Sequence, residues 1–459
     1  MHRRKLILNA TIVNEGRSFV GSLLVVNDRI EYIAEGRDAL PGDLADITIN
    51  AEGCLLLPGV IDEHVHFREP GLTHKADIAS ESRAAAAGGV TTFIDMPNTV
   101  PQTTTIDALH DKLELMKRKS LVNYGCFFGV TKDNVEEIRR LNPREVCGLK
   151  LFMGASTGNM LVDDEAALDS IFQQAALLSL RPRREHPYTL PVMVHCEDTA
   201  LINSNMAACR KEHGDDPEMR FHPLIRSAEA CYASTRKAVA LARKYHTRLH
   251  VAHISTAREL ELFSPDTPYI TAEACVPHLL FTDADYARLG ARIKCNPAVK
   301  TAADRDALRQ ALADGTIASV ATDHAPHALH EKVGGAAKAV SGMPMLQFSL
   351  VAMLGLVDEG VLTVERLVEL MCHAPARIFN IENRGYLREG YKADLVLVRP
   401  HSPWTLTPNR IESQCNWSPL EGHTFSWRVE RTFCNGFLLY NNGVLTEENY
   451  RGQAVRFDR

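Results

Sequence analysis

The sequence predicts an α/β protein in which a TIM-like (β/α)8 barrel carries a small β-rich domain formed by both chain ends. Through the middle of the chain, short apolar strands alternate with amphipathic helices, which is typical of a parallel sheet. Both ends instead contain short β-branched runs separated by turn residues. The length of 459 residues also exceeds the roughly 250 residues of a bare barrel.

The two chain ends are predicted to form one β-rich domain that the rest of the chain interrupts. Turn residues separate the expected strands at the start, and Asn435-Gly436 is a typical hairpin turn near the end. The expected strands are Lys5–Val13, Ser22–Val26, Arg29–Ile33, Ala393–Val398, Ser426–Cys434 and Phe437–Tyr440. We therefore expect residues 1–54 and 386–459 to share this β-rich domain, and residues 55–385 to form the barrel.

The middle of the chain shows the alternation that a barrel requires. Expected strands are Gly89–Ile94, Tyr124–Phe128, Gly148–Phe152, Pro191–His195, Leu249–His253, Tyr269–Glu273 and Ala318–Ala321. Expected helices are Asp107–Lys119, Glu165–Leu180, Ser227–His246, Ala302–Ala313 and Val364–Phe379. An open doubly wound sheet is the alternative, but no glycine fingerprint that would hold a phosphate follows a strand.

Composition limits the class of partner. The net charge of -6 and pI near 6.3 argue against a dedicated nucleic-acid binder. No apolar run reaches membrane-spanning length, and the first residues lack the apolar core of a signal peptide. Eleven scattered cysteines without a CxxC pair are typical of reduced thiols. We therefore expect a cytoplasmic protein without nucleic-acid or membrane partners.

The stretch Leu56–Thr104 contains the most informative pattern. An apolar run ends in His64 and His66, and Arg68 follows two residues later. Alternate side chains of a strand point the same way, so these three would share one face. This arrangement suits a metal ion with an anionic group beside it. The alternative is a strand end with two surface histidines.

Four further residues with metal-binding chemistry lie at expected strand positions. Lys150 lies within an apolar strand, His195 and His253 end two others, and Asp323 follows the last. The carboxyl ends of barrel strands meet at one end of the barrel. Buried Lys150 either reaches a carboxylate or is neutral and captures carbon dioxide as a carbamate. The alternatives are a lysine that extends to solvent and an aspartate that caps a helix.

Together these residues predict a site for two divalent ions bridged by hydroxide. The candidate ligands are His64, His66, Lys150, His195, His253 and Asp323. Bound divalent ions lower the pKa of water from about 15.7 toward about 7, which makes a nucleophile at neutral pH. Zinc suits imidazole and carboxylate ligands. The predicted reaction is hydrolysis of a carbonyl-type bond, or its reversal.

These motifs resemble the amidohydrolase superfamily and, within it, the class I dihydroorotases. The resemblance extends over nearly the whole chain and is most specific in the HxHxREPG and MPNT motifs. The matching segments are His64-Val65-His66-Phe67-Arg68-Glu69-Pro70-Gly71, Thr73-His74-Lys75, Met96-Pro97-Asn98-Thr99, Gly148-Leu149-Lys150, His195-Cys196-Glu197-Asp198, Ala252-His253-Ile254-Ser255-Thr256, Asp323-His324-Ala325-Pro326-His327, Glu331-Lys332 and Asn416-Trp417-Ser418-Pro419-Leu420-Glu421-Gly422.

The resemblance implies a metal-dependent (β/α)8 barrel plus a small β-sandwich made from both chain ends. It also implies a role for each matching residue. His64, His66 and Asp323 would hold one zinc ion. His195 and His253 would hold the other, and carboxylated Lys150 would bridge the two. Asp323 would also be the catalytic residue that moves the proton. The implied substrate contacts are Arg68 and Asn98 with the substrate carboxylate, and further Asn296, His327, Ser341 and Gly342. Some dihydroorotases use a loop aspartate in place of the carbamate, for which Asp163 or Asp164 is the candidate.

The implied activity is zinc-dependent, reversible cyclisation of N-carbamoyl-L-aspartate to (S)-dihydroorotate in de novo pyrimidine biosynthesis. The implied assembly is a homodimer or a complex with aspartate transcarbamoylase. One alternative is another cyclic amidohydrolase, similar to dihydropyrimidinase or allantoinase. A second alternative is a non-catalytic structural relative, although all six ligand positions are filled.

Overall fold

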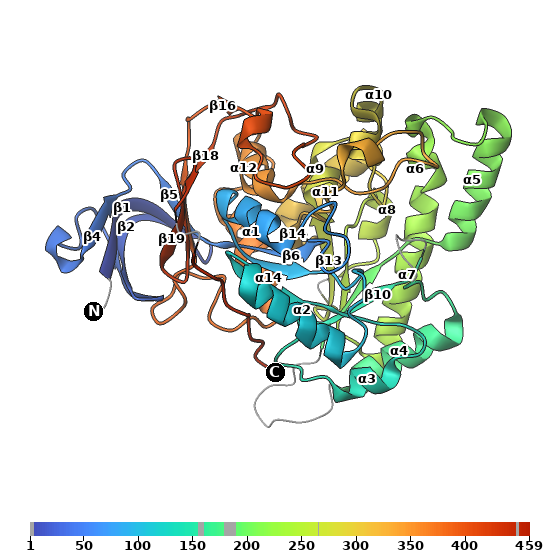
Figure 1. Ribbon diagram of the computed structural model, residues 1–459, viewed down its shortest axis with the longest axis horizontal. Helices are drawn as coiled ribbons and strands as arrows, with labels where there is room; N and C mark the ends of the chain where they lie inside the picture. The colour runs from blue at the N-terminus through green and yellow to red at the C-terminus, as the bar shows by residue number, and fades with distance from the viewer. Residues whose placement is uncertain (1–3, 155–159, 179–189, 265, 447–448) are drawn as a thin grey trace.

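Strands from the two chain ends pair in one nine-stranded, mainly antiparallel sheet beside a barrel (Figure 1). The computed structural model describes residues 4–154, 160–178, 190–264, 266–446 and 449–459. The sheet order is β20-β19-β18-β15-β5-β1-β2-β3, with β4 paired to β1. Its strands are β1 (Arg4–Asn14), β2 (Arg17–Val26), β3 (Arg29–Glu35), β4 (Ile47–Asn50), β5 (Leu55–Pro58), β15 (Leu395–Arg399), β18 (Arg428–Cys434), β19 (Phe437–Asn441) and β20 (Val444–Leu445).

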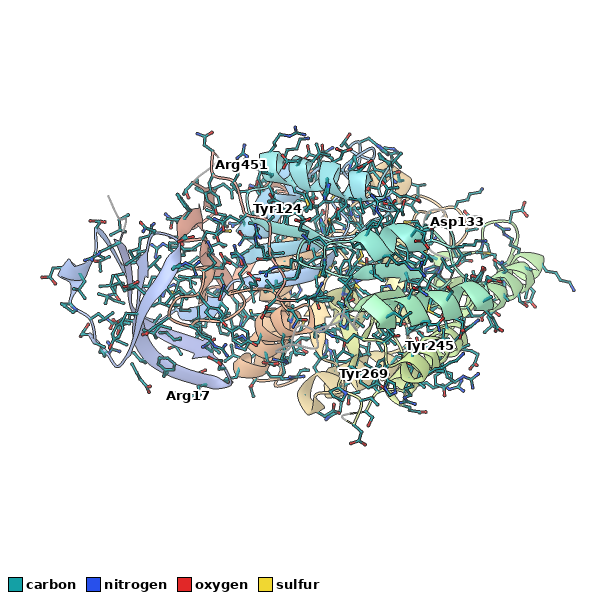
Figure 2. The ribbon with its side chains drawn as sticks, turned by 90° about the horizontal axis from the view of Figure 1, so that it is seen from below. Arg17, Tyr124, Asp133, Tyr245, Tyr269 and Arg451 are labelled. Carbon is teal, nitrogen blue, oxygen red and sulfur yellow. The ribbon has the colours of Figure 1, made fainter. Side chains whose placement is uncertain are left out.

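Strand β5 joins the two ends of the chain. It pairs in parallel with β1 on one side and antiparallel with β15 on the other. Buried Ile12, Leu56 and Leu397 belong to the apolar core of this sheet. In Figure 2, Arg17 lies in this lobe, away from the barrel residues Tyr245 and Tyr269. Both chain ends therefore build one β domain, as predicted, while its exact boundaries stay a prediction.

The larger lobe is a barrel of parallel strands. Its strands are β6 (Val60–Val65), β7 (Val90–Asp95), β8 (Asn123–Cys126) continued by β9 (Phe128–Gly129), β10 (Leu149–Phe152), β11 (Val192–His195), β12 (Leu249–Val251), β13 (Ile270–Cys275) and β14 (Ser319–Ala321). The first and last strands meet where Val65 bridges to His324 and the His66 amide donates to the His324 carbonyl. This closure confirms the predicted fold class.

Helices surround the strands on the outside of the barrel (Figure 1). They are α1 (Ile78–Ala87), α2 (Ile106–Lys119), α3 (Val135–Arg140), α4 (Glu165–Leu178), α5 (Thr199–His213), α6 (His222–Ile225), α7 (Ala228–Tyr245), α8 (Ala257–Leu260), α9 (Val276–Leu280), α10 (Tyr286–Leu289), α11 (Ala302–Asp314), α12 (Ser349–Asp358), α13 (Val364–Val368) and α14 (Ala374–Ile378). The predicted helix end at Leu180 lies outside the described residues. Within the described residues, no helix combines the length and apolarity that crossing a membrane requires.

One predicted helix contains a local irregularity. The predicted helical stretch Val364–Phe379 is helical from Val364 to Ile378, where a π-helical turn, Glu369–His373, joins α13 to α14. Pro375 has no amide proton, and its ring would clash with the carbonyl four residues earlier in an uninterrupted α-helix. A π turn contains one residue more than an α-helical turn. Placed before the proline, it lets the helix continue in the same direction.

The barrel floor is closed by an apolar cluster rather than by the site residues. Phe127, Phe379 and Phe457 are fully buried there and belong to the same cluster. The C-terminal segment runs beside β8, where the Tyr124 amide donates to Gln453. Figure 2 shows Tyr124 and Arg451 on the same side of the barrel. The candidate site residues lie instead around a cavity where the strands finish.

Candidate active site

A cavity at the carboxyl ends of the barrel strands brings together ten of the twelve predicted site residues. They are His64, His66, Arg68, Lys150, His195, His253, Asn296, Asp323, Ser341 and Gly342. Phe152 and Ala325 complete the lining. The remaining two, Asn98 and His327, contact residues of the lining instead. Barrel closure therefore collects side chains that are spread over the chain from residue 64 to residue 342.

The strands present their ligand residues in two ways. His64, Lys150 and His195 lie within β6, β10 and β11. His253 and Asp323 lie two residues beyond the ends of β12 and β14. The predicted strand that ends at His253 is therefore too long, because the chain leaves the sheet after Val251.

Three non-glycine residues of the cavity have left-handed backbones. The φ angles are 67° at Arg68, 40° at His253 and 48° at Asp323. Left-handed backbone is uncommon for residues with a Cβ atom and costs about 1–3 kcal/mol at a site where it is enforced. The turn that follows each strand therefore directs the side chain back toward the barrel axis.

The first group of candidate ligands is His64, His66 and Asp323. Asp323 Oδ1 lies 3.4 Å from His64 Nε2 and 3.1 Å from His66 Nε2. The opposite ring nitrogens are held as well, because His64 Nδ1 lies 2.8 Å from Glu273 Oε1 and His66 Nδ1 lies 2.9 Å from Asn98 Oδ1. Donation from each Nδ1 leaves the Nε2 lone pair of both rings facing Asp323.

The second group is His195, His253 and Lys150. His195 Nδ1 lies 2.9 Å from His253 Nε2, and the other nitrogen of His195 lies 3.1 Å from Glu197 Oε2. Lys150 is 1% exposed, and its Nζ has no hydrogen-bond partner among the described residues. An unpaired buried amine is expensive, so this atom requires a partner that the protein alone does not supply.

Burial favours the neutral form of several nitrogen donors in both groups. It lowers the pKa of His66 to about 4 and holds the pKa of His253 well below its ordinary value. Burial likewise lowers the pKa of Lys150 to about 8. For Asp323, burial alone would raise the pKa, but His64 and His66 lower it, so the carboxylate stays charged. Neutral imidazoles and an ionised carboxylate are the states that bind metal ions.

Two carboxylates that orient the histidines were missed in the sequence. Glu273 lies on β13 and Glu197 follows β11, and both are fully buried. Glu197 also forms an ion pair with Arg226, which lowers the pKa of this carboxyl to about 2 despite its burial. A carboxylate inside or just after an apolar strand is the signal that could have identified them.

A cationic group lies beside the first ligand group. Arg68 donates from Nε to the Pro326 carbonyl at 3.0 Å, and its Nη2 lies 2.9 Å from His327 Nε2. Lys75 Nζ lies 3.1 Å from His327 Nδ1. Arg68 is 6% exposed, and within the described residues it has no carboxylate within ion-pair distance. The buried guanidinium therefore has no directly contacting carboxylate among the described residues.

Lys332 fixes the loop that contributes Ser341 and Gly342. Its Nζ donates to the carbonyls of Val340 at 2.8 Å and Gly342 at 2.6 Å. Gly342 has a φ of 128°, and an added Cβ would lie 2.7 Å from the Ala325 carbonyl oxygen. Only glycine fits this close approach. On the same side of the cavity, the buried Oδ1 of Asn296 has no hydrogen-bond partner among the described residues.

The two aspartates considered in place of a lysine carbamate lie elsewhere. Asp163 and Asp164 are both exposed. Asp164 Oδ1 accepts a hydrogen bond from the Ala167 amide at 2.8 Å, at the start of α4. Lys150, in contrast, lines the cavity. The geometry therefore favours Lys150 as the residue between the two ligand groups.

The fold and the site define a barrel enzyme with candidate metal-binding groups at the carboxyl ends of its strands. A profile described as Amidohydrolase family matches residues 55–439. The chain therefore belongs to the amidohydrolase family and is a hydrolase.

Individual relatives of the chain carry different names. A Halobacterium salinarum protein named dihydroorotase is 34% identical over 418 residues, which cover 91% of this chain and 92% of that protein. A Bacillus velezensis protein named allantoinase is 30% identical over 445 residues, with 95% and 94% covered. The structure of an L-hydantoinase (dihydropyrimidinase) from Arthrobacter aurescens superposes with a TM-score of 0.91 at 26% identity, covering 99% of this chain and 100% of that chain.

Proposed function

We propose that the protein is a dihydroorotase, which cyclises N-carbamoyl-L-aspartate to (S)-dihydroorotate and water and also catalyses the reverse hydrolysis. The observation that carries this proposal is the cationic group beside the ligand residues. Burial, and the charges of Arg68, Lys75 and Lys332, hold the pKa of His327 well below its ordinary value. Lys75 is already paired with Glu331, whereas Arg68 has no carboxylate within ion-pair distance among the described residues. A carboxylate on the substrate would pair with Arg68, and a neutral ring would leave this guanidinium unpaired.

The residues present fit two zinc ions. His64, His66 and Asp323 offer ligand atoms within 4.8 Å of one another, and His195 and His253 form a second pair. The unpartnered Lys150 Nζ lines the same cavity, where carboxylation would give it two anionic oxygens. When bound, the two ions would make water nucleophilic at neutral pH and polarise the ring carbonyl.

The side chains of the protein supply binding and proton transfer. Arg68 and the amide nitrogen of Asn98 hold the substrate carboxylate, since a guanidinium binds carboxylate through parallel N–H donors. Asp323 Oδ1 faces the Nε2 atoms of His64 and His66, where water would be activated. In hydrolysis Asp323 accepts the proton of the attacking water and passes it to the departing ring nitrogen. In cyclisation it moves the proton in the opposite direction.

Asn296, Ser341 and Gly342 are positioned to contact the remaining edge of the substrate ring. The unpartnered Oδ1 of Asn296 can accept a ring N–H, and the Ser341-Gly342 backbone lines the same cavity. Such contacts are available to any cyclic amide. They therefore favour a cyclic amide as substrate, while Arg68 selects the carboxylate.

A second cyclic-amide activity is the alternative, because relatives named allantoinase and hydantoinase match over nearly the whole chain. Steady-state assays of the zinc-loaded protein with dihydroorotate, dihydrouracil, allantoin and hydantoin separate the activities. We expect the highest kcat/KM with dihydroorotate. A preference for any neutral ring would refute the proposal.

Metal analysis tests the non-catalytic alternative. We expect about two zinc equivalents per chain and loss of turnover when a chelator removes them. A protein that binds no zinc and gains no activity when zinc is added would be a structural relative. Sedimentation in solution would test the proposed homodimer, and addition of aspartate transcarbamoylase would test the proposed complex.

A further inference from the structure

The imidazole of His327 lies between two cations, one at each ring nitrogen. Arg68 Nη2 lies 2.9 Å from Nε2, and Lys75 Nζ lies 3.1 Å from Nδ1. The side chain of His327 is only 4% exposed, and both distances are those of direct hydrogen bonds. Glu331 completes the set, with Oε1 3.0 Å from Lys75 Nζ and Oε2 3.5 Å from His327 Nδ1.

A neutral imidazole cannot accept hydrogen bonds at both nitrogens. One nitrogen carries the proton and donates, and the other accepts. A guanidinium has five donors and no acceptor, and an ammonium has three donors and no acceptor. Arg68 at Nε2 therefore requires the proton on Nδ1, and Lys75 at Nδ1 requires it on Nε2. The two cations thus favour opposite tautomers of the same ring.

This inference rests on the proposed dihydroorotase function. The carboxylate of that substrate determines which of the two tautomers forms. We propose that Lys75 is a positioning residue that fixes the tautomer of His327 when substrate is bound. The carboxylate draws Arg68 Nη2 away from the ring. Lys75, held by Glu331, then donates to Nδ1, and the ring proton lies on Nε2, where it donates to the carboxylate.

This arrangement makes carboxylate recognition depend on a residue that does not line the cavity. The lining includes Arg68 but not Lys75 or Glu331. Without Lys75, the ring proton would stay on Nδ1, because Glu331 can accept a hydrogen bond from it. His327 Nε2 would then present a lone pair to the carboxylate, and the two would repel each other. Binding of a neutral ring would not depend on this tautomer.

The test compares Lys75→Met and Lys75→Arg with the wild type as zinc-loaded full-length protein. Lys75→Met should raise KM for dihydroorotate about tenfold and change kcat by less than about twofold. Turnover of dihydrouracil should not change. Lys75→Arg should recover part of the loss, because it keeps a donor at Nδ1. Lys392→Met is a matched control, because it removes a similarly buried lysine paired with Asp28 in the β domain.

NMR spectra of protein with 15N-labelled histidine show which ring nitrogen carries the proton. A loss of stability would not change this result. His327 is assigned from the signal that is missing in His327→Gln. With saturating dihydroorotate, the wild type should carry the His327 proton on Nε2, and Lys75→Met should carry it on Nδ1. The same tautomer in both proteins, or an unchanged KM, would overturn the role of Lys75. A wild type that turns over only neutral rings would overturn the proposed function and this inference with it.

Discussion

Replacing Arg68 with methionine tests the selection of an anionic substrate. Methionine keeps most of the aliphatic stem of this 6% exposed side chain and removes the guanidinium. Nε of Arg68 already donates to the Pro326 carbonyl at 3.0 Å, so the terminal nitrogens are the atoms left for a substrate. We therefore count about one to two charge-assisted hydrogen bonds to the substrate carboxylate, at about 1.5–3 kcal/mol each.

A loss of about 3 kcal/mol corresponds to a fall in kcat/KM of about 100-fold. The assay follows dihydroorotate by its ultraviolet absorbance and measures zinc content in the same samples. Dihydrouracil turnover is the internal control and should not fall, because a neutral ring has no carboxylate to lose. Arg68→Lys should recover only part of the activity, since an ammonium lacks the planar pair of donors.

Two outcomes would refute this reasoning. One is a fall in kcat/KM of less than about threefold for dihydroorotate with full zinc occupancy, which would mean that Arg68 does not hold the carboxylate. The other is an equal fall for dihydrouracil, which would mean that Arg68 acts by supporting the site as a whole. In Arg68→Met the Pro326 carbonyl loses its donor, which costs about 1 kcal/mol of stability and would act on both substrates alike.

Three further predictions concern the metal ligands and their partners. Asp323→Asn should lower kcat by about 10²–10⁴-fold, because the proton carrier is lost; near-normal turnover in a zinc-replete sample would exclude that role. Glu273→Gln should weaken zinc binding by about 10–100-fold in competition with a chelator, because the carboxylate that orients His64 is replaced; unchanged affinity would contradict it. Burial lowers the pKa of Lys150 to about 8, so the neutral amine that captures carbon dioxide predominates above this pH and declines below it. Metal-free protein given 13C-bicarbonate and zinc should therefore regain activity faster at pH 9 than at pH 7. Its 13C spectrum should show one carbamate carbon signal. A signal that persists in Lys150→Arg would place the carbamate on another residue.

Much of the fold could be predicted from local patterns. The strand and helix positions follow from apolar periodicity, and the alanine-rich run before Gly88-Gly89 ends α1 at Ala87 as a glycine stop should. The π turn at Glu369–His373 could not be predicted in this way. The apolar spacing on its two sides is compatible with one regular helix, and Pro375 is the local signal that a regular helix would be interrupted near this position.

The candidate ligand positions were also accessible from the sequence. His64, Lys150 and His195 lie on apolar strands, and parallel strands of one barrel must finish at the same end. His253 and Asp323 were found for the same reason, although each lies two residues beyond its strand. Their left-handed backbones have no sequence signal, because neither residue is glycine.

The contacts that orient and tune these residues depended on the tertiary structure. Glu273 reaches His64 across 209 positions of sequence, and Lys75 reaches His327 across 252. The sequence by itself determined which side chains point from which strands, because that depends on the period of a strand and the direction of a parallel sheet. Only closure of the barrel decided which of them touch, because a hydrogen bond requires two atoms within about 3 Å, and no local pattern specifies that distance between remote segments.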